Sequence, residues 1–221
     1  MEKKKIVFSL IYTLFALTQL LAQSTPRTAK DFIDRGNRFY DQGNYNDAIA
    51  DYSNALQLDH NNVMALSCRS RTYHVIGDFD KAIVDYNTLL NIGIAPATIL
   101  TARAKAYYDK GDLNKAIEDC SASLKINPND EETLIIRSKA FCEKDEFDNA
   151  IADYRVLLRI NPRNTVVLKE LAEALYNRGV EHYYNGDLNK AIEHWEEVLR
   201  INPDDASAKK NLDIARRQRS N

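Results

Sequence analysis

The chain has 221 residues, and its 30 Lys and Arg against 32 Asp and Glu leave a formal net charge of −2. This balance argues against a general nucleic-acid binder, which carries a clear basic excess. Hydrophobic residues make up 44% and charged residues 28%, a globular composition that argues against intrinsic disorder. With 7 Gly and 5 Pro the chain has too few turn residues for an all-β protein, so we expect an all-α fold.

The first 22 residues have the pattern of a secretory signal peptide. Lysines at positions 3 to 5 precede an uncharged, mainly apolar run over residues 6–21, and the segment ends at Ala22. A membrane-spanning helix needs roughly 20 apolar residues, so we expect cleavage after Ala22; the alternative is that the segment is retained as an anchor. We therefore predict a signal peptide over 1–22 and a short linker over 23–28. The mature protein is expected to be exported, periplasmic or extracellular, without a membrane-spanning segment.

The rest of the chain contains an internal repeat of 34 residues. A polar residue followed by Ala and Ile begins at residues 47, 81, 115 and 149, and again at residue 190 after a longer interval of 41. Six of the seven glycines fall at two places of this frame, the eighth and the fifteenth. Places are counted here from the first residue of each repeat, and the repeats cover 29–62, 63–96, 97–130, 131–164 and 172–205.

Each repeat predicts two amphipathic helices. Apolar or small residues at places 4, 8 and 11, and then at 17, 20, 21, 24, 27 and 28, follow the 3.6-residue period of a helix. The glycine at place 15, such as Gly43, can take the left-handed conformation that ends a helix, and the Asn or Asp after it can cap the next one. In the fourth repeat Asp145 stands in the glycine's place, and Asp tolerates positive φ better than most residues.

This pattern resembles the tetratricopeptide repeat. The family's order of bulky, small, aromatic, Gly, Ala, aromatic and small residues appears in the first repeat, and its closing proline in three later ones: Phe32, Gly36, Phe39, Gly43, Ala48, Tyr52, Ala55, Pro128, Pro162 and Pro203. The resemblance covers residues 29–205 and implies a right-handed α-solenoid of about five helix-turn-helix repeats. The second repeat departs most from the family pattern, because it lacks the closing proline.

Seven additional residues, 165–171, precede the last repeat. Seven residues turn a helix through nearly two full turns, so the apolar face stays in register. We predict a single helix from about Thr165 to Tyr184 that protrudes beyond its neighbours. Residues 206–221 predict a C-terminal capping helix with Leu212 and Ala215 inward and basic residues outward, which gives the stack a polar end.

Charged residues recur in the repeats at two places. Arg occupies place 7 in all five repeats and Asp occupies place 23 in four: Arg35, Arg69, Arg103, Arg137 and Arg178; Asp51, Asp85, Asp119 and Asp153. An arginine ladder for phosphate is one interpretation, but the equal repetition of the acid favours an ion pair between the two helices of each repeat. In the fifth repeat His194 replaces this Asp, and His182 stands where the frame has an aromatic residue.

The resemblance implies a concave ligand groove along the first helices of the repeats, at places 2, 5, 9 and 12. Cations beside aromatic rings at places 9 and 12 suit an extended peptide with carboxylates and apolar side chains. The alternative is that the aromatics belong to the repeat pattern and the cations are simply solvated. The candidate partner-binding residues are Asn37, Tyr40, Arg71, His74, Lys105, Tyr108, Lys139 and Tyr183.

We expect no catalytic site, no cofactor and no metal site. The four histidines form no metal-ligand spacing, and no Gly-rich phosphate loop or GxSxG motif is present. The three cysteines have no CxxC spacing, and Cys120 with Cys142 is the only pair that adjacent repeats would permit to form a disulfide. We expect buried or half-buried thiols at Cys68, Cys120 and Cys142 instead.

The sequence therefore predicts a scaffold, not an enzyme. It would bind a partner protein or peptide, of acidic character, in the concave groove, with no role for nucleic acid. The alternative is a structural or assembly factor that acts through oligomerisation, or through contact of the protruding helix and the basic C-terminal helix with an envelope surface.

Overall fold

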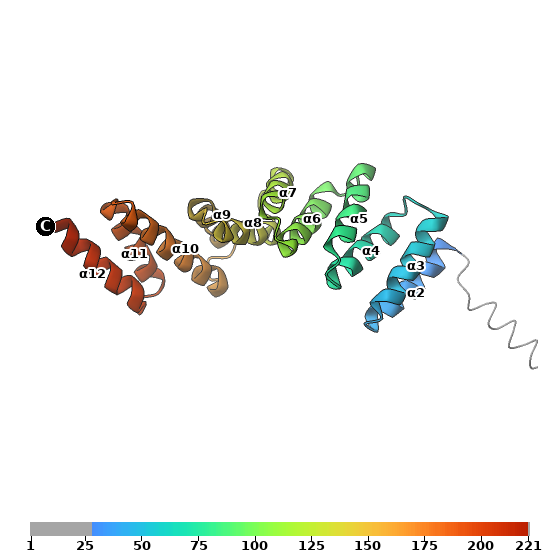
Figure 1. Ribbon diagram of the computed structural model, residues 1–221, viewed down its shortest axis with the longest axis horizontal. Coiled ribbons are helices and arrows are strands. Elements are labelled where there is room, and N and C mark those ends of the chain that lie inside the picture. Colours follow the sequence, from blue (N-terminus) through green and yellow to red (C-terminus); the bar gives the residue numbers. More distant parts are fainter. Residues whose placement is uncertain (1–27, 221) are drawn as a thin grey trace, which may run out of the picture. The chain divides into compact units, whose positions relative to one another are not determined.

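The computed structural model describes residues 28–220, and in that range it consists of eleven α-helices without a strand. The predicted signal peptide and the linker up to residue 27 lie outside the described residues. Figure 1 shows the helices in chain order. They are α2 (Ala29–Asp41), α3 (Tyr45–Leu58), α4 (Val63–Val75), α5 (Phe79–Ile92), α6 (Pro96–Lys110), α7 (Leu113–Ile126), α8 (Glu131–Glu143), α9 (Phe147–Ile160), α10 (Thr165–Tyr184), α11 (Leu188–Ile201) and α12 (Ala206–Ser220).

The helices pack as consecutive hairpins, which confirms the predicted all-α fold of helical repeats. The closest packing is between α2 and α3, α4 and α5, α6 and α7, α8 and α9, and α10 and α11 (Figure 1). The chain divides into two compact units, residues 1–92 and 93–221. The described part of the first unit holds α2 to α5, and the second unit holds α6 to α12.

The turns inside the hairpins depend on residues with positive φ. Gly43, Gly77, Gly111 and Gly186 have φ between 78° and 88°, a conformation that costs glycine nothing. Asp145 takes the same place with φ 58°, as its position in the repeat predicts. The predicted cap after the glycine forms at Asp112, whose side chain accepts from the Lys115 amide, but Asn44 makes no such bond.

The two helices of a hairpin approach closely where a glycine faces a large aromatic ring. Gly36 lies against Tyr52, and Gly179 lies against Trp195. A Cβ at Gly179 would be 2.6 Å from Trp195 Nε1, and one at Gly36 would be 2.7 Å from Tyr52 Cε1. The small residue at place 8 is therefore required by the ring at place 24 of the same repeat.

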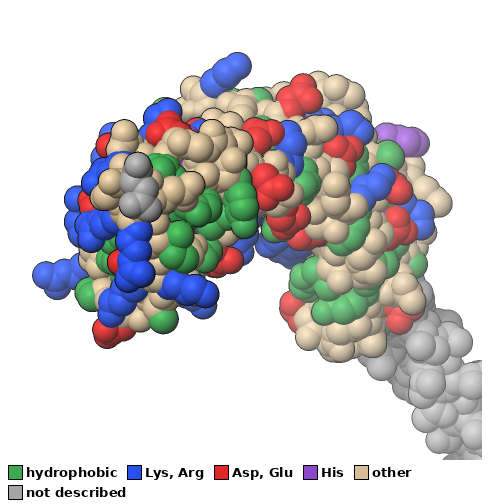
Figure 2. Space-filling model, turned by 60° about the vertical axis from the view of Figure 1, so that its left-hand side comes forward, with side chains coloured by type: hydrophobic (Ala, Val, Ile, Leu, Met, Phe, Trp, Pro, Cys, Tyr) green, Lys and Arg blue, Asp and Glu red, His purple; other side chains and the backbone are tan. Residues whose placement is uncertain are grey.

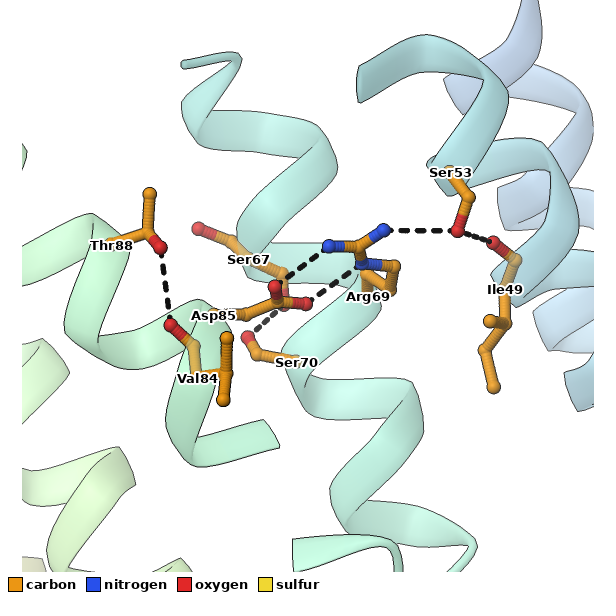
Figure 3. Close-up of polar contacts among 8 residues, drawn as sticks. All are labelled: Ile49, Ser53, Ser67, Arg69, Ser70, Val84, Asp85 and Thr88. Atoms are coloured by element: carbon orange, nitrogen blue, oxygen red, sulfur yellow. Dashed lines mark hydrogen bonds and ion pairs between the residues drawn. The ribbon is translucent and has the colours of Figure 1, made fainter. Parts of the chain in front are cut away.

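Ion pairs join the two helices in four of the five repeats, as predicted. The guanidinium binds the buried carboxylate through two nitrogens, with N to O distances of 2.6 to 2.8 Å, in Arg35–Asp51, Arg69–Asp85, Arg103–Asp119 and Arg137–Asp153. Figure 3 shows one example, in which Arg69 of α4 also donates to the Ser53 hydroxyl of α3. These arginines are thus structural, because their donors are used inside the repeat stack.

Helix α10 covers Thr165–Tyr184, the range that the seven additional residues predict, but its first turns do not protrude freely. Val167 and Leu171 are buried in the core of the second unit, where α10 packs on α9. The prediction of a protruding helix is therefore wrong for this face. At the other end of the unit, α12 buries Ala208, Leu212 and Ala215 against the same core.

The cysteine thiols are buried or half-buried, as expected. Cys68 and Cys120 are buried and Cys142 is half-buried, and all three are free. Burial raises the pKa of Cys120 to about 12, so this thiol stays protonated and unreactive at neutral pH.

None of the helices within residues 28–220 is long and apolar enough to cross a membrane.

Candidate functional site

In the first unit the candidate groove residues lie on α2 and α4, which contact each other. The Arg71 guanidinium lies 4.9 Å from the centre of the Tyr40 ring, so place 9 of one repeat meets place 12 of the preceding one. Asn37 accepts a hydrogen bond of 2.8 Å from the Tyr52 hydroxyl, so its amide oxygen is used within its own hairpin. His74 lies half-buried with its ring 5.4 Å from that of Phe79. Arg71 is thus the exposed member of this set, and it lies against the half-buried Tyr40 ring.

In the second unit Lys105 and Tyr108 lie on α6 and Lys139 lies on the adjacent α8. Both lysines are exposed. The Tyr108 hydroxyl donates to a carboxylate oxygen of Glu143 on α8. Burial, followed by this carboxylate, raises the pKa of Tyr108 above its ordinary value. Tyr108 therefore joins α6 to α8 as a neutral group. The ammonium groups of Lys105 and Lys139 belong to the same two helices.

Tyr183 is the last of the predicted partner-binding residues. It borders a pair of hollows in the second unit, between α10 and α12. The first has a volume of about 550 Å³, and the second, of about 340 Å³, shares Tyr176 with it. We call the two together the α10–α12 groove. The first hollow is lined by Thr165, Leu168, Lys169, Ala172, Glu173, Tyr176, Ile201, Asn202, Asp205 and Ser207, and the second by Tyr176, Val180, Tyr183, Tyr184, Trp195, Asn211 and Ile214.

Hydrogen bonds hold the centre of the groove in place. The Tyr176 hydroxyl accepts from the Asn211 side-chain amide of α12 at 3.0 Å. The Trp195 indole N–H of α11 donates to the Tyr176 carbonyl oxygen at 3.2 Å. Tyr176 is thereby fixed from both sides, and a binding surface built on a preformed element loses little entropy when it is occupied.

Large apolar side chains are exposed along the groove. Tyr184 is 82% exposed and Ile214 is 41% exposed, and the Tyr183 ring lies 5.8 Å from that of Tyr184. Figure 2, in which the C-terminal helices come forward, shows apolar side chains at the surface beside groups of Lys and Arg side chains. Exposed aromatic rings next to polar and charged groups are typical of protein-binding surfaces.

Most of this groove was not predicted from the sequence. Tyr176 and Val180 occupy places 5 and 9 of the last repeat, so extending the groove pattern to residues 172–184 would have found them. Asn211 and Ile214 on α12 carry no such signal, because α12 lies outside the repeat frame.

The lining of the groove is suited to binding. Its charged groups are Lys169, Glu173 and Asp205, and Asp205 already accepts the Ala208 amide at the start of α12. Within residues 28–220 no group of three or more His, Cys, Asp or Glu residues is placed to hold a metal ion. The arrangement suits aliphatic or aromatic side chains of a partner, oriented by a few polar contacts.

Family models recognise the repeats. A model described as "Tetratricopeptide repeat" matches residues 97–130 and 172–205, and one described as "TPR repeat" matches residues 36–75. No curated protein matches the chain in sequence.

Solved structures share the fold at low sequence identity. The protein YrrB, described as a TPR protein with an unusual peptide-binding site, is 20% identical with a TM-score of 0.63, over 88% of this chain and 96% of its own. The protein MamA is 20% identical with a TM-score of 0.67, over 80% of this chain and 93% of its own. A tetratricopeptide repeat protein from Parabacteroides merdae is 17% identical with a TM-score of 0.61, over 87% of this chain and 86% of its own.

These matches agree with the helical hairpins, the turn residues with positive φ and the small residues between helices described above. Tetratricopeptide repeat proteins are in general scaffolds for protein–protein interaction without enzymatic activity. The chain is a tetratricopeptide repeat protein.

Proposed function

We propose that the protein is a non-catalytic scaffold that binds a segment of a partner protein, and that the α10–α12 groove is its main docking site. The observation that carries the proposal is the pair of adjoining hollows centred on Tyr176. The smaller hollow is lined mainly by aromatic and aliphatic side chains, and the larger one mixes apolar with polar and charged side chains. Sites that bind peptide side chains combine these two kinds of group.

We further propose that the partner segment is acidic. Lys105 and Lys139 are exposed on the first helices of the second unit, the unit that holds the groove. Cations on a binding face attract carboxylates and increase the rate of association, an effect that salt weakens. The apolar groove would then provide most of the binding affinity, and the cations would provide the preference for acidic segments.

A peptide selection tests the docking site. Peptides are selected from a random displayed library on the purified protein, and their affinities are measured by fluorescence anisotropy. Tyr184→Ala combined with Ile214→Ser should weaken binding at least about tenfold, because each change removes an exposed apolar contact. Both side chains are exposed, so the variant should fold.

Val166→Ser is the matched control, because Val166 lies on α10, is 68% exposed and does not line the groove. It should bind like the wild-type protein. If the Tyr184 and Ile214 variant binds as well as this control, the groove is not the docking site. Replacing Lys105 and Lys139 by Glu should in turn reduce the affinity for acidic peptides, and unchanged affinity would refute the proposed acidic preference.

Assembly through the beginning of α10 is the less favoured function. Leu171 is 4% exposed and belongs to the core of the second unit, and Leu168 lines the larger hollow. Leu171 is therefore not available to a second molecule. The part of this alternative that remains is contact through the basic face of α12.

We propose that the scaffold acts outside the cytoplasm. The support is the pattern of residues 1–22, three lysines followed by an uncharged apolar run. N-terminal sequencing of the protein from fractionated cells should find a chain that starts at Gln23 in an exported fraction. A chain that starts at Met1 in the cytoplasm would contradict this.

A further inference from the structure

The arginine at place 7 has two regular neighbours in the earlier repeats. One is the buried aspartate at place 23 of the second helix. The other is an aromatic ring at place 11, four residues after the arginine, which lies 5.8 to 5.9 Å from the guanidinium in the second, third and fourth repeats. A charge, its counter-charge and a ring thus form one recurring contact between the helices.

In the fifth repeat both neighbours are histidines. His182 stands at place 11 and His194 at place 23, and their rings are stacked with centroids 5.3 Å apart and planes 13° from parallel. His182 is buried, at 8% exposed, and His194 is half-buried. Arg178 keeps its place on α10 but binds Asp148 of α9 instead. The interface between α10 and α11 has therefore exchanged an ion pair for two stacked titratable rings.

The charged groups around these rings come from three helices and a turn, and the acidic ones already have basic partners. Asp148 on α9 and Glu181 on α10 both bind Arg178, at 2.5 and 2.7 Å. Asp187, in the turn before α11, binds Lys190 at 3.1 Å. Glu197 on α11 binds Arg155 of α9 at 3.0 Å. Asp148, Asp187 and Glu197 partly offset the positive charge at the rings, but burial and the nearby cations outweigh them and lower the pKa of both histidines.

We propose that His182 and His194 form a proton-sensitive contact that loosens the packing of α10 against α11 at acidic pH. Two protonated rings in this stack would repel each other and Arg178 in a partly buried place. Burial is the first cause that lowers the pKa of both histidines, followed by Arg178 for His182 and by His182 for His194.

The direction of the pH dependence follows from linkage. Each histidine has a lower pKa in the folded protein than its ordinary value of 6.5. The unfolded chain therefore binds protons more readily, and stability is full above about pH 6.5 and falls as the pH drops through that value toward the folded pKa. The neighbours Tyr183 and Trp195 line the smaller hollow of the α10–α12 groove, so the same protonation would reach the groove.

Two measurements test the proposal on the full chain. The first follows thermal unfolding between pH 7.5 and 5.0 through the fluorescence of Trp195, the single tryptophan of the chain, which lies next to His194. The unfolding temperature of the wild-type protein should fall by on the order of 3 °C more than that of a His182→Tyr, His194→Asp variant. That variant restores the aromatic and acidic residues of the other repeats. His60→Gln, at an exposed turn, is the matched control and should keep the wild-type pH dependence.

The second measurement is an NMR titration of the histidine ring protons in the wild-type protein, which does not depend on the folding of any variant. His182 and His194 should titrate below 6.5, in two coupled steps. Equal falls in the unfolding temperature of the wild-type protein and the variant would overturn the proposal. Titration of both rings at or above pH 6.5 would overturn it as well.

Discussion

Gly179 shows how a single residue sets the distance between two helices. Its α-carbon faces the indole of Trp195, which is 1% exposed and hydrogen-bonded to the Tyr176 carbonyl oxygen. In the third repeat the corresponding residues are Ala104 and Cys120, a larger residue opposite a smaller one. Cys is much smaller than Trp, so the alanine of this pair has the room that Gly179 lacks, as expected for a tightly packed interface.

Gly179→Ala is expected to destabilise the protein by about 1–2 kcal/mol. An added Cβ would lie 2.6 Å from Trp195 Nε1, so the ring or the helix must move. The sign is informative, because Gly to Ala inside a helix otherwise stabilises by roughly 1 kcal/mol. Urea unfolding followed by circular dichroism measures the difference, and an increase in the free energy of unfolding would show that the contact is not tight.

At the level of elements, α12 has two different faces. Leu212 is 6% exposed and closes the core of the second unit, whereas Ile214, two residues later, is 41% exposed and lines the smaller hollow. The helix therefore caps the repeat stack on one side and forms a wall of the α10–α12 groove on another.

Leu212→Ala should therefore cost about 2–4 kcal/mol of unfolding free energy, because it leaves a cavity in the core. Ile214→Ala is the matched control, on the same helix, and should change stability by less than about 1 kcal/mol while weakening peptide binding. The pair is compared by thermal unfolding and by peptide affinity. Similar stability losses in both variants would contradict the two-faced description of α12.

The elements were predictable because their signals are local. The turns at place 15, with glycine or with Asp145 in the fourth repeat, depend on residues within a few turns of helix. The register of residues 165–171 depends on near neighbours in the same way. The aspartates paired with the arginines were predictable too, because the 34-residue period repeats both partners. The burial of Leu171 was not, because it depends on how α9 packs on the first turns of α10.

The candidate site was predictable in part. The repeat frame found Tyr183, and Tyr40 next to Arg71, because places 9 and 12 share one helix face. It did not find the wall of the groove on α12, since residues 206–220 have no counterpart in the frame. It also gave no sign that His182 and His194 stack, because each histidine was explained by its own place and not by the other.

At the level of the whole molecule, the described residues form two units of helical hairpins. Each unit contains first helices that contact their neighbours, α2 with α4 and α6 with α8. The second unit adds the α10–α12 groove and the histidine pair, whose sequence neighbours Tyr183 and Trp195 line the smaller hollow. We propose that a partner binds in this groove.

The most direct test of that claim is chemical-shift mapping on the isotopically labelled protein with a selected peptide. We expect the largest shifts to cluster at Tyr176, Val180, Tyr183, Asn211 and Ile214, with much smaller changes at Val166 and in α3 and α5. Saturable shifts that cluster elsewhere and leave α10 and α12 unchanged would contradict it.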